Sequence, residues 1–331
     1  MKLWSKDIIR AAIIGFLLPA VLFHIVAAVL AQTEDAPIPS GTQITLPPPV
    51  TQTTSAGFPL FMPVQSDGEV IQMDIEKYLI GVLLAEMPAD FEMEALKAQA
   101  VAARTYALKC HAQGYKHAGA VCTNASCCQG YMTQEAYLES GGSRQEILRV
   151  MAAVNHTAGQ VLCYDGKLIL ATYFDCSGGS TEDAAAVWGQ VYPYLQAVPS
   201  PGEEKAAYFE DEKTVTPEQL QEALGCILPE DPESWFAEFT YTPGGGVDTV
   251  KIAGVSYRGT TLRSLLGLRS TAFEIKIDGE NIIFLTRGYG HRVGLSQYGA
   301  DAMAISGSDY RQILAHYYQN AILTQFEQNM L

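Results

Sequence analysis

The sequence predicts an α+β fold behind an apolar N-terminal segment, and the order of its hydrophobic patterns is the main reason. Helical spacing dominates the first part of the domain, up to about Cys110. Further along, apolar and polar residues alternate around the turn-forming pairs Asp165-Gly166 and Asp278-Gly279, which is typical of antiparallel hairpins. Helices followed by hairpins favour an α+β arrangement over a doubly wound parallel sheet.

The N-terminal segment has the properties of a transmembrane helix. Residues 11–31 contain no Asp, Glu, Lys or Arg, and as a helix they would reach about 30 Å, enough to cross a bilayer. Basic residues precede this run and acidic residues follow it, which places residues 1–10 in the cytoplasm and the rest of the chain outside. A signal peptide cleaved after Ala31 is the alternative. The run exceeds the roughly 7–15 apolar residues of a signal peptide, so an uncleaved anchor is favoured.

A linker and a large domain follow this segment. Residues 32–57 are rich in Pro, Thr and Ser and are predicted to form an extended tether. Residues 58–331 suffice for one large domain or two closely packed ones. The chain has 36 acidic and 21 basic residues, a net charge of −15, and no basic run of the kind that binds nucleic acid. We therefore expect a tethered extracytoplasmic domain with no nucleic-acid partner.

Two helices are predicted at the start of the domain. Apolar residues at helical intervals indicate a helix over residues 73–84, which Pro88 ends. Asp90 is a suitable N-cap for a second, Ala-rich helix that runs to about Cys110. One stripe of the second helix is apolar and its opposite side is small (Leu96, Ala100, Ala103 and Ala107; Ala95, Ala98 and Ala102). Other elements are therefore expected to pack closely on two sides of this central helix.

The later elements are predicted to be antiparallel hairpins and short helices. The expected segments are two hairpins and two helices (residues 160–164 with 167–174; 273–277 with 282–286; 261–266; 309–318). Gly267 is expected to close the first of these helices. Ile313 and Leu314 are expected to face inward from the last one.

Glu86 is a candidate acid–base residue. Glu86 lies in an apolar stretch that includes Leu84 and Met87. Apolar surroundings raise the pKa of a carboxyl group. Hydrolysing glycosidases normally use two carboxylates. A lytic transglycosylase needs only one, because the substrate's own 6-hydroxyl replaces water as the attacking group. The alternative for Glu86 is a surface residue at the end of a helix.

A cluster of cysteines follows the Ala-rich helix. His117, Cys122, Cys127 and Cys128 offer one imidazole and three thiolates, a suitable set for tetrahedral zinc. Adjacent cysteines bridge each other only with strain, which disfavours a disulfide between the last two. Other disulfides stay open, since an extracytoplasmic location permits them and seven cysteines leave at least one unpaired. Either arrangement is structural, because four protein ligands leave no open position for catalysis.

Two Gly-rich loops, residues 174–181 and 286–300, carry polar side chains suited to sugars. The predicted contacts are Ser177 in the first loop and three residues in the second (Tyr289, His291 and Gln297). Neither loop matches a phosphate-binding fingerprint. A hydrogen-bonded structural role is the alternative for His291. The sequence contains neither a serine nucleophile elbow nor an HExxH zinc motif.

Several motifs together indicate a family. The segments AEMPADFEMEALKAQAVAARTYAL, YFDCSGGSTEDAAAVWG, LRSLLGLRS, TRGYGHRVGLSQYGA and YRQILAHYY occur in this order. In this combination the chain resembles the stage II sporulation protein D family of membrane-anchored peptidoglycan lytic transglycosylases from endospore-forming bacteria. The resemblance runs from about Ile71 to Tyr318. It implies that Glu86 is the catalytic glutamate and that Lys97 and Arg104 are basic residues that bind the substrate. The alternative for these two cations is a solvated helix face.

The resemblance also bears on the cysteine cluster and the second Gly-rich loop. Some family members bind a structural zinc through a His, a Cys and a closing His-Cys pair. His117, Cys122 and Cys128 take three of those places, and Cys127 stands where the second His would be. Arg292 replaces a residue that is commonly small, so the geometry of that loop follows less directly from the resemblance. No organic cofactor is implied.

The function implied by the resemblance is specific. The substrate would be peptide-stripped glycan strands, cleaved between N-acetylmuramic acid and N-acetylglucosamine with formation of a 1,6-anhydro end. The implied partners are a stage II sporulation protein P-type amidase and a stage II sporulation protein M-type membrane scaffold. The setting would be forespore engulfment, in the space between the mother-cell and forespore membranes. The alternative is a non-catalytic glycan-binding enhancer of a cell-wall amidase, in which Glu86 only hydrogen-bonds a sugar.

Overall fold

The structure is a computed structural model that describes residues 60–66, 68–114, 117–279 and 281–330. The predicted cytoplasmic tail, membrane helix and linker (1–10, 11–31 and 32–57) lie outside the described residues. None of the helices within these ranges is long and apolar enough to cross a membrane.

The described part of the chain is a mixed α+β fold with several small sheets, as predicted. Its α-helices are α2 (Ile75–Glu86), α3 (Met93–Ala112), α4 (Gln134–Glu139), α5 (Arg144–His156), α6 (Ala184–Trp188), α7 (Pro217–Leu224), α8 (Gly259–Leu266), α9 (Gln297–Ile305) and α10 (Tyr310–Tyr317). Short 3-10 turns are η1 (His117–Gly119), η2 (Pro232–Ser234) and η3 (Gln328–Met330).

The strands form six small sheets in this part of the chain. They are β1 (Phe61–Ser66), β2 (Glu69–Asp74), β3 (Val121–Cys122), β4 (Gln160–Tyr164), β5 (Lys167–Leu168), β6 (Tyr173–Phe174), β7 (Gly179–Ser180), β8 (Pro199–Ser200), β9 (Glu210–Val215), β10 (Phe236–Tyr241), β11 (Val247–Ile252), β12 (Val255–Arg258), β13 (Phe273–Asp278), β14 (Asn281–Arg287), β15 (Leu295–Ser296) and β16 (Ile322–Gln325). The sheet orders are β2-β1-β3, β16-β4-β5, β15-β6, β7-β8, β10-β11-β12 and β13-β14-β9. Most pairs are antiparallel; β1 with β3 and β15 with β6 are parallel.

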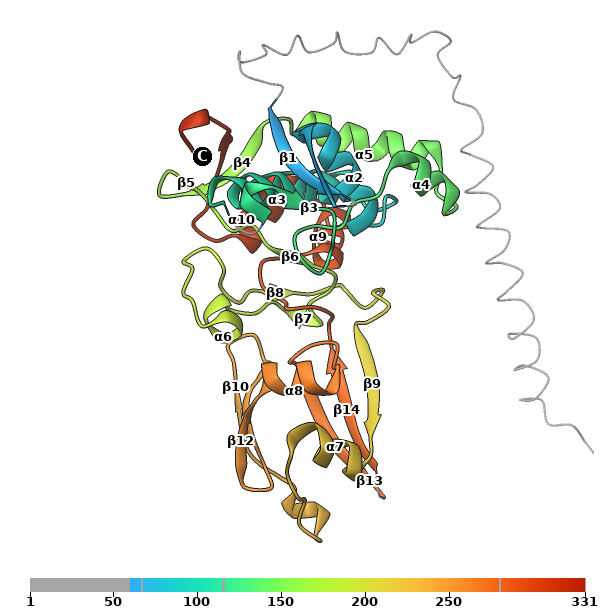
Figure 1. The fold of residues 1–331 in the computed structure, drawn as a ribbon, viewed down its shortest axis with the longest axis vertical. Helices are drawn as coiled ribbons and strands as arrows, with labels where there is room; N and C mark the ends of the chain where they lie inside the picture. The colour runs from blue at the N-terminus through green and yellow to red at the C-terminus, as the bar shows by residue number, and fades with distance from the viewer. Residues whose placement is uncertain (1–59, 67, 115–116, 280, 331) are drawn as a thin grey trace, which may run out of the picture. The chain divides into compact units, whose positions relative to one another are not determined.

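Helix α3 is the centre of the helical part of the domain. It contacts α2, α5, α9, α10 and β4 (Figure 1). The predicted apolar stripe and the predicted small side are both buried, because two hydrophobic clusters meet on this helix. Small alanine side chains allow this close approach from several directions, as the sequence indicated.

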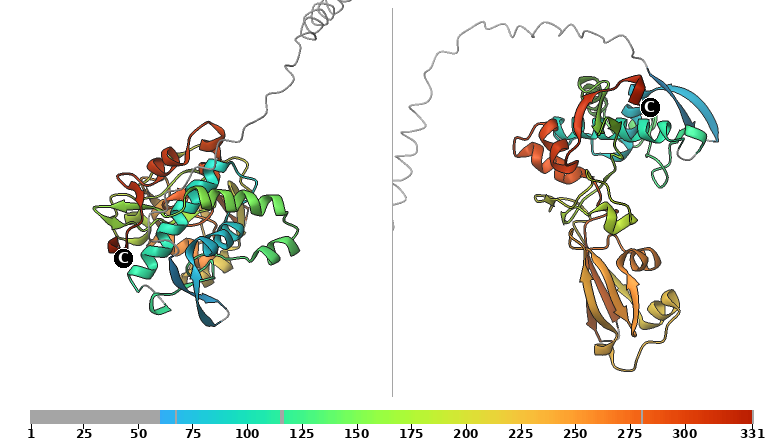
Figure 2. Two further views of the ribbon diagram at one scale, coloured as in Figure 1. Left: turned by 90° about the horizontal axis from the view of Figure 1, so that it is seen from above. Right: turned by 90° about the vertical axis from the view of Figure 1, so that its left-hand side faces the viewer.

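A third hydrophobic cluster lies among the later strands. It joins β9, β11, β13 and β14 to α7 and α8 through residues such as Leu220, Leu262 and Phe284. Figure 2 shows these strands in yellow to orange with the two helices beside them. The domain therefore has a helical core around α3 and a separate core under its antiparallel sheets.

Three elements predicted from the sequence are confirmed closely. Strands β13 and β14 pair around Asp278, as the Asp-Gly turn indicated. Helix α8 ends at Gly267, which adopts the left-handed conformation with φ 62°. Helix α10 begins after Asp309, whose side chain forms a capping box with Gln312. Both inward residues of α10 are buried.

Two local predictions are wrong. Helix α3 begins after Glu92, which makes no side-chain cap, so Asp90 is not the N-cap. The strand predicted over residues 167–174 ends at Leu168, and Tyr173 and Phe174 form β6, which pairs with β15 from the far end of the chain. A distant partner strand competed successfully with the local hairpin.

Candidate functional site

A cleft of about 680 Å³ lies beside α3. One face of the helix lines it with residues at the helical intervals i, i+3, i+4 and i+7 (Tyr106, Lys109, Cys110 and Gln113). Aromatic side chains make much of the remaining wall (Tyr173, Trp188, Tyr192 and Tyr194). Aromatic faces and a few polar groups form a surface suited to a polar organic ligand such as a sugar chain.

Glu86 lines this cleft at the end of α2 and is half-buried. Burial raises the pKa of its carboxyl, and a hydrogen bond accepted from the Gly130 backbone N–H opposes that rise. A Cβ on residue 130 would lie 2.8 Å from the Glu86 Oε1 atom. Glycine is therefore what lets the backbone N–H approach the carboxylate. The apolar surroundings predicted from the sequence produce the expected direction of the pKa shift.

A hydrogen-bond network holds the Gly130 loop against α3. The Gln129 amide nitrogen donates to the Ala103 carbonyl at 3.3 Å and to the Tyr173 hydroxyl oxygen at 2.9 Å. The Tyr78 hydroxyl donates to the Gln129 carbonyl oxygen at 3.2 Å. Burial and the nearby Glu86 charge raise the pKa of Tyr173 well above its usual range. Tyr173 therefore stays a neutral hydroxyl next to the carboxyl group.

His291 reaches the cleft from the second Gly-rich loop. Its ring lies edge-on to Trp188 and Phe174, with centroids 5.3 and 5.7 Å apart. Burial, with a smaller effect of the Arg263 charge, lowers the pKa of His291 to about 4. The Nδ1 atom accepts the Val293 backbone N–H at 3.1 Å, so the neutral ring carries its hydrogen on Nε2.

The predicted metal ligands converge. One ligand atom from each of His117, Cys122, Cys127 and Cys128 lies within 4.8 Å of every other, and the His117 Nε2 atom is 3.3 Å from the Cys127 sulfur. Tetrahedral zinc with bonds of about 2.0–2.3 Å requires ligand separations of about 3.3–3.8 Å, which fall within the range of this cluster. This cluster can therefore hold a metal ion. No disulfide joins any of the seven cysteines.

The metal cluster and Glu86 belong to one structural unit. Cys127 and Cys128 line the same cleft as Glu86, and Gly130 follows only two residues after Cys128. The segment that gathers the thiols is thus the segment that presents an N–H to the carboxyl group. A metal held by four protein ligands would support this loop without entering the chemistry.

Arg104 does not reach the cleft, and the structure corrects its predicted role as a substrate contact. Its side chain is fully buried and binds Glu76 with two hydrogen bonds of 2.9 and 2.6 Å. It also donates to the Gln160 carbonyl at 3.2 Å. No part of the Arg104 side chain is exposed to a ligand. It is also not the solvated cation on a helix face that the alternative interpretation predicts. Arg104 joins α2, α3 and β4 from inside the domain.

Four more of the predicted contacts also lie outside the cleft lining, whereas His291 lines it. Lys97 pairs with Glu94 at 2.6 Å on its own helix. Ser177 is buried and donates its hydroxyl to Glu203 at 2.9 Å, so it too is not a substrate contact in this structure. Gln297 is buried at the start of α9, and Tyr289 packs its ring against Tyr208 and Arg269 instead.

Arg292, the departure from the family pattern, has a definite place. It adopts a left-handed φ of 62° and its buried guanidinium donates to the carbonyls of Ser177, Ser180 and Gly244. Its only described carboxylate partner is Glu182, at 3.5 Å. The two Gly-rich loops are thus joined by Arg292, which explains why they contribute structure more than ligand contacts.

The sequence reasoning missed most of the cleft lining. Lys109 is the cation that α3 presents to the cleft, one turn beyond Arg104 and on a different face. The i, i+3, i+4, i+7 spacing of polar and aromatic residues from Tyr106 to Gln113 was the available signal. No local signal marks Trp188 or Tyr192, because only the fold brings α6 and its loop to this site.

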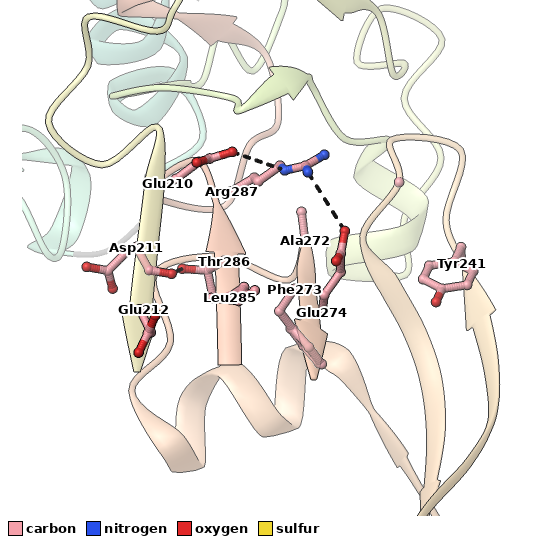
Figure 3. Close-up of a pocket in the computed structure, with 11 residues that line it drawn as sticks. Glu210, Asp211, Glu212, Tyr241, Ala272, Phe273, Glu274, Leu285, Thr286 and Arg287 are labelled. Carbon is pink, nitrogen blue, oxygen red and sulfur yellow. Dashed lines mark hydrogen bonds and ion pairs between the residues drawn. The ribbon is translucent and has the colours of Figure 1, made fainter. Parts of the chain in front are cut away.

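A second hollow lies on the outer face of the β13-β14-β9 sheet. It has a volume of about 580 Å³ and carries acidic side chains around Arg287 (Figure 3). Arg287 lies 3.7 Å from Glu210 and 3.8 Å from Glu274, and all these side chains are more than half exposed. We call this surface the sheet groove. Arg287 and the two glutamates paired with it are solvated.

Known proteins resemble this chain over most of its length. Residues 65–164 match the family described as "Stage II sporulation protein". Stage II sporulation protein D of Bacillus amyloliquefaciens is 36% identical over 275 residues, covering 81% of this chain and 79% of that protein. Stage II sporulation protein D of Bacillus subtilis (strain 168) gives the same identity and covers 80% of that protein. The chain belongs to the stage II sporulation protein D family. The resemblance read from the motifs is thereby confirmed.

The stage II sporulation protein D family match coincides with the candidate site. Residues 65–164 include Glu86, helix α3 and the whole metal cluster. A protein named "Amidase enhancer" from Bacillus subtilis (strain 168) is also similar, at 29% identity over 306 residues. That alignment covers 75% of this chain and 40% of the enhancer. The family domain thus also occurs within a larger protein.

Proposed function

We propose that this protein is a peptidoglycan lytic transglycosylase that acts during sporulation. One observation supports this most directly. Among the described residues that line the cleft, Glu86 is the only carboxylic acid, and burial raises its pKa. A hydrolase of the usual kind would need a second carboxylate across the bond to activate water. A single protonated carboxyl suits a reaction whose nucleophile comes from the substrate.

The proposed reaction uses Glu86 twice. Its protonated carboxyl first gives a proton to the oxygen of the bond between N-acetylmuramic acid and N-acetylglucosamine, and that bond breaks at C1 of the muramic sugar. The resulting carboxylate then takes the proton of the 6-hydroxyl of the same sugar as its oxygen bonds to C1. A 1,6-anhydro end forms, and Glu86 is protonated again. The raised pKa favours the acid form that the first step requires.

The surrounding groups support this chemistry by position. The Gly130 N–H fixes one oxygen of the carboxyl group, leaving the other directed to the substrate. Neutral His291 and neutral Tyr173 can donate hydrogen bonds to sugar oxygens without adding charge beside the acid. The aromatic wall supplies faces on which sugar rings stack.

Product analysis tests this proposal. Purified full-length chain and its Glu86→Gln variant are incubated with peptide-stripped glycan strands, and the ends are identified by mass spectrometry. Anhydro-muramic ends from the parent and not from the variant support the proposed reaction. Hydrated reducing ends would instead mean hydrolysis and a second, undetected acid–base group.

A second candidate function is suggested by the similarity to the amidase enhancer. In this case the cleft binds glycan and increases the activity of a separate amidase without cleaving. The Glu86→Gln variant distinguishes the two functions. An enhancer keeps its effect on an added wall amidase when Glu86 is replaced, whereas the effect of a transglycosylase on the wall is lost.

We further propose that the four-residue cluster holds structural zinc. Three thiolates and one imidazole are the donors that zinc prefers, and they already converge. Metal analysis of purified protein should give about one zinc per chain. Replacing Cys122 by Ser should lower both the zinc content and the melting temperature. A metal-free protein of unchanged stability would contradict this site.

The cellular setting is proposed on the same basis. An N-terminal anchor over residues 11–31 would place the enzyme outside the cytoplasmic membrane, near its wall substrate. A stage II sporulation protein P-type amidase would supply peptide-stripped strands, and a stage II sporulation protein M-type scaffold would hold both. N-terminal sequencing of protein from membranes tests the anchor, because a chain that begins at Gln32 would show cleavage.

A further inference from the structure

Lys109 is a cation in the cleft that has no partner of opposite charge. It is half-buried and lines the same cleft as Glu86. Among the described residues no carboxylate lies within ion-pairing distance of it, although the chain has 36 acidic residues against 21 basic ones. By contrast, Lys97 and Arg104 on the same helix are both ion-paired. The Lys109 ammonium is therefore available to an anionic group in the cleft.

The position of Lys109 relative to Glu86 follows from contacts along α3. Gln129 donates to the Ala103 carbonyl, and the next residue, Gly130, donates to Glu86. The acid therefore lies beside the Ala103 turn of α3. Lys109 comes six residues later, which is about 9 Å along a helix, with Tyr106 between them on the same face. A chain molecule lying along α3 from Glu86 would thus pass Tyr106 and reach Lys109.

The charged groups that act on the pKa of Lys109 include no carboxylate among the described residues. Burial, followed by the charge of Lys167 on the neighbouring hairpin, lowers the pKa of Lys109, and the Cys110 and Cys163 thiols oppose this shift. The hairpin strand β5 contacts α3, so the two lysines face the same region. Lys109 does lie in the last turn of α3, where a cation interacts favourably with the helix dipole. A cation elsewhere in that turn would gain the same effect, so the dipole does not require a lysine in the cleft wall.

We propose that Lys109 binds a carboxylate substituent of the glycan held in the cleft. This inference rests on the proposed function. N-acetylmuramic acid without its stem peptide carries such a carboxylate on its lactyl ether, whereas N-acetylglucosamine carries none. Acidic and neutral sugars alternate along the strand. Lys109 therefore sets the register, so that only one of the two alternating glycosidic bonds lies at Glu86.

Binding to a protein that cannot turn over tests this role separately from catalysis. The full-length Glu86→Gln variant is titrated with a peptide-free tetrasaccharide of alternating N-acetylglucosamine and N-acetylmuramic acid, and with the same molecule after conversion of its carboxylates to methylamides. A charge-assisted contact predicts about tenfold tighter binding of the acid. Adding Lys109→Gln should remove that preference. Lys109→Arg should retain most of it.

Lys77→Gln provides the matched control. Lys77 is an exposed lysine on α2, so its replacement makes the same change in net charge away from the cleft. It should leave the preference for the acid unchanged. The preference should also weaken with added salt, because it depends on an ion pair at a half-buried site.

Three outcomes would overturn the inference. Equal affinity of the Glu86→Gln parent for acid and amide would show that no cation reads the carboxylate, whether or not the Lys109 variants fold. If Lys109→Gln lowered the affinity for both ligands equally, the role of Lys109 would be to stabilise the helix and not to bind the carboxylate. If the Glu86→Gln parent bound neither ligand, this cleft would not be a glycan-binding site. Failure of the proposed reaction is a different result, namely absence of anhydro products from wild type while the binding preference persists.

Discussion

The cleft beside α3 and the sheet groove are similar in volume, at about 680 and 580 Å³, but differ in the burial and ion pairing of their charged side chains. The groove carries several carboxylates, of which the exposed Glu210 and Glu274 pair with Arg287. The cleft carries one, which is half-buried, unpaired with any described cation and raised in pKa. Glu86 is thus set apart by its burial and by being the single carboxylic acid among the described residues of the cleft lining, since cavity size does not distinguish the two sites.

The same contrast holds for the arginines and the aromatic residues. Arg104, behind the cleft, is fully buried and bonded to Glu76, whereas Arg287 is 58% exposed. Several aromatic side chains line the cleft, whereas Tyr241 is the tyrosine that lines the groove. A desolvated, aromatic-lined site strengthens electrostatic interactions with a ligand, and a solvated one does not. The comparison predicts large effects at the cleft and small ones at the groove.

The largest expected difference concerns the two glutamates. Glu86→Gln should reduce the rate of glycan cleavage by roughly a hundredfold to ten-thousandfold, because it removes the only carboxylic acid among the described residues that line the cleft. Glu274→Gln, at the groove, should leave the rate within about twofold, because its ion pair is exposed. Rates of anhydro-end formation are the measurement. Comparable losses in both variants would end the distinction between the two sites.

The next difference concerns the two arginines and is one of stability. Arg104→Ala should lower the free energy of unfolding by about 3 kcal/mol or more, because it leaves the Glu76 carboxylate without its cation. Arg287→Ala should cost less than about 1 kcal/mol. Urea unfolding of both variants measures this. A small effect at Arg104 would mean that Glu76 finds solvent easily, and would reopen a ligand role for the arginine.

Replacing one glycine at each site should lower activity at the cleft and stability at the groove. A Cβ at Gly130 meets the Glu86 carboxylate, the movable end of a side chain, so Gly130→Ala should keep the fold but displace the acid. A displacement of this kind predicts a loss of about tenfold or more in kcat. Gly245→Ala, in the groove, meets no atom but has φ +79°, so it should cost about 1 kcal/mol or more of stability and no activity. Kinetics and thermal melts together test both variants.

The smallest expected effect is a gain in stability. Folding raises the pKa of Glu86, so the folded chain holds that proton more tightly than the unfolded chain. The stability contributed by this group is therefore lost as pH rises from the ordinary glutamate value, about 4, through the raised pKa. Glu86→Gln avoids this loss and should be more stable than wild type at pH 7. The two proteins should converge near pH 4, and a less stable variant at pH 7 would contradict burial as the cause.

Local features of the fold were predictable from particular residues. The capping box of Asp309 and Gln312, the Gly267 stop and the hairpin around Asp278 each depend on a few neighbouring residues. The metal cluster was predictable for the same reason, since its ligands lie within twelve positions of one another. The strand at Tyr173 was not, because its partner, Leu295, is more than a hundred residues away.

The sequence by itself therefore determined the family and indicated the candidate acid and the four candidate ligands, because motif identity and short-range chain geometry carry that information. It did not determine which side chains share the cleft. Arg104 and Lys109 occupy the same helix and look equivalent as cations, yet only packing against Glu76 buries one and leaves the other in the cleft. His291 and Trp188 reach Glu86 from distant segments. Burial and unmatched charge are set by contacts between such segments, and the tertiary structure alone decides them.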